Sequence, residues 1–159
     1  MNGLFRRLYY RWIDCELDHP IAIPDFDEEE SGVRNQWIGE TGERLAAKTL
    51  WRNGHRVLYR NFRARGGGEL DLVSRHRDTL VFSEVKTRTS DQFGRPADAV
   101  DQEKQRLIIR GANAWLRELN HPEILFRFDV IEVLLLKDEV PEVRVNEGAF
   151  SSPQVGLGM

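Results

Sequence analysis

The segment Gly66–Arg88, GGGELDLVSRHRDTLVFSEVKTR, constrains the fold of this 159-residue chain more than any other. Its two runs ELDLV and TLVFSEVKT are rich in Leu, Val and Phe and flank the turn SRHRD, so they predict two antiparallel strands. If Arg77 and Asp78 form a two-residue turn, Asp71 lies opposite Glu84 and Glu69 lies opposite Lys86. Side chains alternate along a strand, so we expect all four charged groups on one face. The other face then takes Leu70, Leu72, Ser83 and Val85.

Two opposed carboxylates, Asp71 and Glu84, need an explanation. Like charges directly across a strand pair are destabilising, on a scale of about 0.2–1 kcal/mol in water. A divalent cation would offset this cost, because Mg²⁺ takes hard oxygen ligands and uses one or two protein carboxylates. Lys86 would then be placed to hold a phosphate or to polarise a water. The alternative is that these residues form solvent-facing ion pairs, since an acid-x-Lys triplet is a weak signal.

Two predicted helices supply further candidates. In the helix expected over Arg34–Asn53, Glu43 shares the apolar stripe of Gly39, Ala46 and Leu50, and an inward-facing glutamate is rarely left unpaired. A second helix is expected from Asp101, which can cap it, to about Leu119. Its Lys104 lies on the stripe of Ile108, Gly111 and Trp115, where it either reaches a site or extends to solvent.

The strong strand runs HRVLYRNFR and LFRFDVIEVLLL complete the predicted order α-β-β-β-α-β. This order is typical of an α/β layer architecture with a mixed sheet. We expect an N-terminal helix and acidic linker over residues 1–33, a compact domain over 34–137, and an edge strand with a mobile tail over 138–159.

Composition excludes several classes of protein. With 40% hydrophobic and 31% charged residues the chain is typical of a globular domain, and it contains no apolar run long enough to span a membrane. One cysteine and four scattered histidines offer no zinc-type ligand set. The net charge of −3 hides an acidic stretch, residues 14–30, beside a middle region, 34–137, in which basic residues outnumber acidic ones. We therefore expect a cytoplasmic protein whose main domain is compatible with a polyanionic partner.

Five blocks resemble a known family. GETGERLAAKTL, RNFRARGGGELDLV, LVFSEVKTR, KQRLIIRGANAWL and RFDVIEV occur in the order and with the gaps of the YraN-like family of bacterial proteins. That resemblance implies a restriction-endonuclease-like fold related to Holliday junction resolvases. It implies Asp71 and Glu84 as metal ligands, Lys86 as the catalytic lysine and Glu43 as the accompanying helix acid. Residues 1–33 and the tail lie outside the resemblance.

The expected function is metal-dependent hydrolysis of phosphodiester bonds in DNA, branched or otherwise structured. Mg²⁺ or Mn²⁺ would be held by Asp71 and Glu84, with the carbonyl of Val85 as a further ligand and Glu43 near the metal's water shell. Two symmetric cuts in a junction would require a homodimer. Basic side chains around this face would contact nucleic acid, namely Arg56, Arg60, Arg63, Arg65, Arg88, Arg95 and Lys104.

Two other interpretations remain. The chain could be a non-cleaving nucleic-acid-binding module, or an accessory protein, built on a nuclease fold. Residues 1–33 could instead dock a protein partner, or the acidic stretch could fold over the basic face and inhibit DNA binding.

Overall fold

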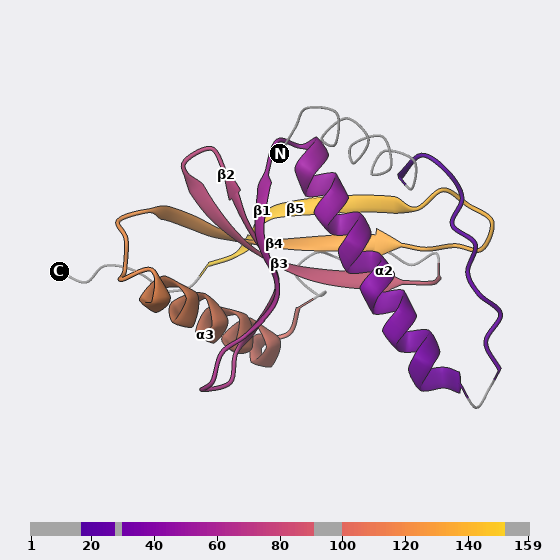
Figure 1. Cartoon of the computed structure of the whole chain (residues 1–159), viewed down its shortest axis with the longest axis horizontal. Coiled ribbons are helices and arrows are strands. Elements are labelled where there is room, and N and C mark those ends of the chain that lie inside the picture. The colour runs from indigo at the N-terminus through magenta and orange to yellow at the C-terminus, as the bar shows by residue number, and fades with distance from the viewer. Residues whose placement is uncertain (1–16, 28–29, 91–99, 152–159) are drawn as a thin grey trace, which may run out of the picture.

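The computed structural model describes the chain except for residues 1–16, 28–29, 91–99 and 152–159 (Figure 1). The predicted order α-β-β-β-α-β is confirmed, and one more strand follows it. The elements are α2 (Ser31–Arg52), β1 (Arg56–Arg63), β2 (Glu69–His76), β3 (Thr79–Arg88), α3 (Gln102–Glu118), β4 (Leu125–Leu134) and β5 (Glu142–Phe150).

The strands form one mixed sheet in the order β1-β2-β3-β4-β5. β1, β2 and β3 pair antiparallel, β3 and β4 pair parallel, and β4 and β5 pair antiparallel. A parallel pair requires a crossover, and α3 provides it between β3 and β4 (Figure 1). The architecture is that of an α/β nuclease-like core, as the sequence predicts.

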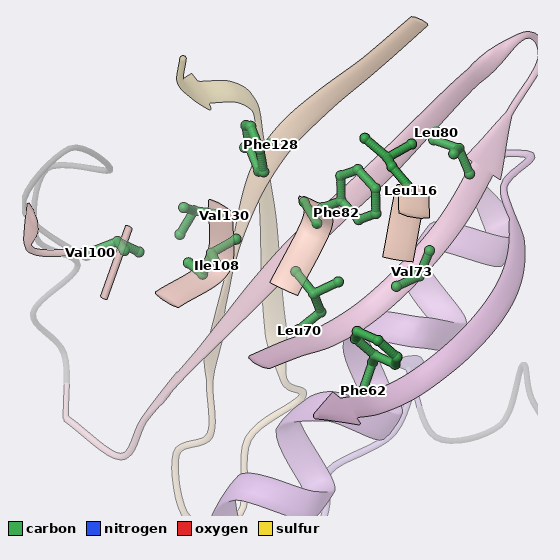
Figure 2. Close-up of a cluster of buried hydrophobic side chains, with 11 residues drawn as sticks. Phe62, Leu70, Val73, Leu80, Phe82, Val100, Ile108, Leu116, Phe128 and Val130 are labelled. Carbon is green, nitrogen blue, oxygen red and sulfur yellow. The ribbon is translucent and has the colours of Figure 1, made fainter. Parts of the chain in front are cut away.

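Apolar side chains on the two faces of the sheet form separate cores. Phe82, Phe128 and Val130 pack with Ile108 and other residues of α3, and we call this the α3-side core. Figure 2 shows its strand and helix side chains meeting in one layer. The neighbouring positions on β4 point the other way, so Ile131 and Val133 pack with Leu45 and Leu50 of α2 in the α2-side core.

Three boundaries differ from the sequence-based expectation. α2 begins at Ser31 rather than Arg34, and β5 continues to Phe150. Leu17 is buried in the α2-side core, and Ile21 and Ile23 pack against it, so part of the predicted acidic linker covers this face. The first sixteen residues of the predicted N-terminal helix and linker lie outside the described residues. No helix in the described part of the chain is long and apolar enough to cross a membrane.

Candidate active site

The hairpin of β2 and β3 has the expected register, with His76 paired to Thr79 and Leu72 paired to Ser83. Regular pairing ends at Leu72 and Ser83, and the next contact is made by a side chain: the Asp71 carboxylate accepts the Val85 backbone N–H at 2.8 Å. The expected alternation is wrong for Leu70, which packs in the α3-side core, whereas Leu72 lies in the α2-side core. Asp71 therefore lies just beyond Leu72, the last residue of β2 that pairs regularly with β3.

Glu84 on β3 is the most buried acid of this group, at 3% exposure. Its Oε1 lies 3.0 Å from the Lys86 ammonium and 3.3 Å from the Lys104 ammonium. Its Oε2 is buried and has no hydrogen-bond partner within the described part of the chain. A buried carboxylate oxygen without a partner carries a desolvation cost of about 1–3 kcal/mol or more. A proton shared with the Asp71 carboxyl, or a bound cation, would relieve this cost.

The charge on Asp71 is disfavoured by its surroundings. Burial, the negative charge of Glu84 and a hydrogen bond between the two carboxyls together raise the pKa of Asp71 to about 7, against the opposing effects of the Val85 amide and Lys104. Near neutral pH, without a bound cation, Asp71 therefore carries a proton much of the time. Two carboxyls whose charges repel in a buried site are typical of functional positions.

Lys104 belongs to this group because α3 delivers it to the acids. The Asp101 side chain caps the helix by accepting the Lys104 backbone N–H at 2.8 Å, which fixes the first turn. The Lys104 ammonium then pairs with both Glu69 and Glu84. Burial lowers the pKa of Lys104, but the Glu69 hydrogen bond and the charges of Glu84 and Asp71 outweigh this effect and raise it. Lys104 is therefore a charged member of the cluster.

Glycines allow α3 to approach the hairpin this closely. A Cβ on Gly68, whose φ is +135°, would lie 2.6 Å from the Gly111 backbone nitrogen. A Cβ on Gly111 would lie 3.1 Å from the Glu69 carbonyl oxygen. Larger side chains at either position would force α3 away from β2 and move Lys104 from the acids.

Glu43 has different neighbours. Its carboxylate accepts a hydrogen bond from the Asn61 amide at 2.8 Å and lies 3.8 Å from the Arg60 guanidinium. Both residues lie on β1, and Asn61 has a φ of 54°. The described contacts of Glu43 are thus with β1, and none of them joins it to Asp71 or Glu84. Glu43 is half-buried, in agreement with its place on the predicted apolar stripe of the helix.

The predicted nucleic-acid contacts divide by position. Four are exposed on β1 and on the loop of residues 64–68 that follows it, which we call the glycine loop, namely Arg56, Arg60, Arg63 and Arg65. Arg88 is half-buried at the end of β3, and Arg95 lies outside the described residues.

A hollow of about 510 Å³ lies between the glycine loop and α3. Arg63 and Arg65 line it from the loop, and Arg117 lines it from the helix. Sequence reasoning missed Arg117. The signal was present, because Arg106, Arg110 and Arg117 recur at helical spacing and are exposed.

Glu132 is a second missed residue. It pairs with Lys86 across the parallel β3–β4 ladder, so both side chains project from the same face. It is 2% exposed, and its Oε1 has no hydrogen-bond partner among the described residues. An acid inside the apolar run VIEVLLL was the available signal.

Comparison with known proteins places the chain among uncharacterised relatives. The family model described as uncharacterised protein family UPF0102 matches residues 42–133. A UPF0102 protein of Trichlorobacter lovleyi is 45% identical over 120 residues, which is 75% of this chain and 94% of the relative. One from Geobacter sulfurreducens is 43% identical over 121 residues, covering 76% and 94%. One from Caldanaerobacter subterraneus is 39% identical over 114 residues, covering 72% and 93%.

Proposed function

This chain belongs to the uncharacterised protein family UPF0102, the YraN-like family of the sequence comparison, and we propose that it is a metal-dependent nuclease. It would hydrolyse phosphodiester bonds in DNA, with branched or otherwise structured DNA as substrate. The observation that carries this proposal is the pair of half-buried Asp71 and buried Glu84, in which the Oε2 of Glu84 has no hydrogen-bond partner among the described residues.

The donor set fits a hard divalent cation. Asp71 and Glu84 supply carboxylate oxygens, the ligands that Mg²⁺ and Mn²⁺ prefer. The raised pKa of Asp71 reflects negative charge that burial and Glu84 disfavour, and a cation would relieve it. The Val85 amide is already used to hold Asp71, while its carbonyl as a ligand stays a prediction.

When bound, the cation would lower the pKa of a water and stabilise the negative charge that develops on the phosphate. Lys86, 3.0 Å from Glu84 Oε1, would orient that water or donate to a phosphate oxygen. Lys104 would hold Glu69 and Glu84 in position. A role for Glu43 in positioning the metal's water shell stays a prediction, because its described contacts are with Asn61 and Arg60 of β1.

The basic hollow between the glycine loop and α3 would take the DNA backbone. Three of its lining side chains, Arg63, Arg65 and Arg117, are exposed and match phosphate chemistry. Lys104 lies on the same helix as Arg117, so a DNA strand lying in this hollow would run toward Asp71 and Glu84. A homodimer would place two such sites for paired cuts in a junction.

The test is cleavage of labelled four-way junction, flap and linear DNA in Mg²⁺ or Mn²⁺ and in EDTA. We expect metal-dependent cutting by the wild type, at least about 100-fold slower cutting by Asp71→Asn and Lys86→Met, and unchanged cutting by the exposed control Glu142→Gln. Binding of these DNAs without cutting, in either metal, would contradict the proposal.

One observation favours the runner-up function, a nucleic-acid-binding module that does not cleave. Lys86 and Lys104 already neutralise Glu84 Oε1, so the chain itself supplies cations to the acidic cluster, by which we mean Glu69, Asp71 and Glu84. In that case Asp71→Asn would leave DNA affinity unchanged and EDTA would have no effect. A nuclease would instead show metal-dependent cutting that this substitution removes.

A further inference from the structure

Two of the histidines that are scattered in the sequence meet in the fold. His55 immediately precedes β1, His76 ends β2, and the pairing of Arg56 with Arg75 brings these positions together. The two imidazole rings stack with centroids 4.3 Å apart and planes 13° from parallel. His55 is buried and His76 is half-buried. Because the nitrogen lone pairs lie in the ring planes, one ring must turn out of this stack for both to bind one ion, and His76 is the more exposed of the two.

Glu147 of β5 joins this pair. One ligand atom from each of His55, His76 and Glu147 lies within 4.8 Å of the others. β1 and β5 are the two edge strands of the sheet, so this meeting requires the sheet to coil until its edges approach. A register shift between Phe128 and Val130 on β4, and Gly148 at a φ of 61°, bend the β4–β5 pair at this point.

Both kinds of ligand are held by neighbouring groups. The Nδ1 of His55 is hydrogen-bonded with the Ser74 hydroxyl at 3.1 Å, which leaves its Nε2 for another partner. The Glu147 carboxylate lies 3.2 Å from the Arg127 guanidinium, which also pairs with Asp129. Metal-binding histidines and carboxylates are commonly oriented by such outer partners. Burial lowers the pKa of His55, and so do His76 and Arg127, which favours the neutral imidazole that binds metals.

We propose that His55, His76 and Glu147 bind a divalent transition metal ion of the zinc class. Two imidazoles and one carboxylate are a set for Zn²⁺ or Co²⁺, with a fourth position left for water, whereas Mg²⁺ prefers oxygen ligands. The ion would join the β1–β2 end of the sheet to β5 and so stabilise its coiled shape. This site is separate from the Asp71–Glu84 cluster and does not depend on whether the protein cleaves DNA.

The test is titration of the full-length protein with Zn²⁺ by calorimetry in excess Mg²⁺, with thermal unfolding measured in Zn²⁺ and in EDTA. We expect one equivalent of Zn²⁺ to bind and the melting temperature to rise with free Zn²⁺. His76→Ala and Glu147→Ala should each weaken binding by about tenfold or more. Asp71→Asn, which alters only the acidic cluster, should leave Zn²⁺ affinity unchanged.

The substitutions avoid His55, because a buried side chain can be required for folding. Nitrogen NMR of the histidine rings in the wild type supplies the independent readout, and Zn²⁺ should shift Nε2 of His55 rather than Nδ1. No saturable Zn²⁺ binding by the wild type would overturn the proposal. It would equally be overturned by binding that survives both substitutions and is lost in Asp71→Asn.

Discussion

Asp129 on β4 and Glu84 on β3 are both buried acids on neighbouring strands, but their surroundings differ. Asp129 is fully buried, and its two oxygens accept from Arg127 Nε at 2.9 and 3.1 Å, while Oδ1 also accepts the Gly148 N–H at 2.9 Å. Glu84 has two lysines at one oxygen and no described partner at the other. Both oxygens of Asp129 thus have hydrogen-bond partners, whereas Oε2 of Glu84 has none among the described residues. Burial alone therefore does not tell a structural acid such as Asp129 from a candidate functional acid such as Glu84. The difference lies in how many hydrogen-bond partners each carboxylate has.

The largest expected effect is on stability. Asp129→Ala removes the buried partner of Arg127 and of the Gly148 N–H and leaves Arg127 only the exposed Glu147, so the free energy of unfolding should fall by up to about 3–5 kcal/mol. Asp71→Asn should leave it unchanged or raise it, because the lost charge is disfavoured in the fold while the amide oxygen can still accept the Val85 N–H. Urea unfolding in EDTA measures both. If Asp129→Ala and Asp71→Asn lost the same free energy of unfolding, the proposed difference between the structural acid and the acidic site would be wrong.

Gly68→Ala should have the next largest effect. The added Cβ would meet the Gly111 backbone at a positive φ, which costs about 1–3 kcal/mol in strain and overpacking. α3 would be displaced, and Lys104 with it, so cleavage should fall together with stability. Gly66→Ala is the matched control, because nothing lies within 4 Å of its added Cβ. A Gly68→Ala protein as stable as this control would show that the close helix approach is unnecessary.

The pH dependence of stability should report the raised pKa of Asp71, the carboxyl beside the incompletely paired Glu84. The pKa of Asp71 is about 7 in the folded chain, against 3.8 in the unfolded chain, so between these values the folded state holds a proton that the unfolded state releases. Its contribution to stability therefore declines as pH rises from about 4 to about 7, by at most about 1.4 kcal/mol per unit, and is constant above. Unfolding in EDTA across this range should show the decline in the wild type. The same decline in Asp71→Asn would assign it to another group.

A smaller effect should appear in the pKa of Asp71 when Lys104 is substituted. The charge of Lys104 lowers the pKa of Asp71, so Lys104→Met should raise that pKa further. Carboxyl carbon NMR in EDTA follows the titration directly. Arg110→Met, an exposed site on the same helix, serves as the control and should leave it unchanged. An unshifted Asp71 in Lys104→Met would remove the lysine from the electrostatics of the site.

The sequence predicts the fold and the hairpin well because both depend on local patterns. The Arg77–Asp78 turn sets the hairpin register that brings Asp71 near Glu84, although strict alternation fails at Leu70. The helix stripe leaves open whether Lys104 reaches the acids or extends to solvent. The contacts of Glu43 with Asn61, and the place of Glu132 beside Lys86, depend on packing and pairing between distant segments. The meeting of His55, His76 and Glu147 requires the coiling of the whole sheet, which no local pattern records.

The most direct test of the central claim is Mn²⁺ binding, measured by electron paramagnetic resonance on wild type, Asp71→Asn and the control Glu142→Gln. If the open oxygen of Glu84 and the carboxylate of Asp71 serve a cation, the wild type and Glu142→Gln will bind Mn²⁺ saturably. Asp71→Asn, still folded, will bind it about tenfold more weakly or not at all. Equal Mn²⁺ affinity in all three proteins, or none in the wild type, would contradict the account.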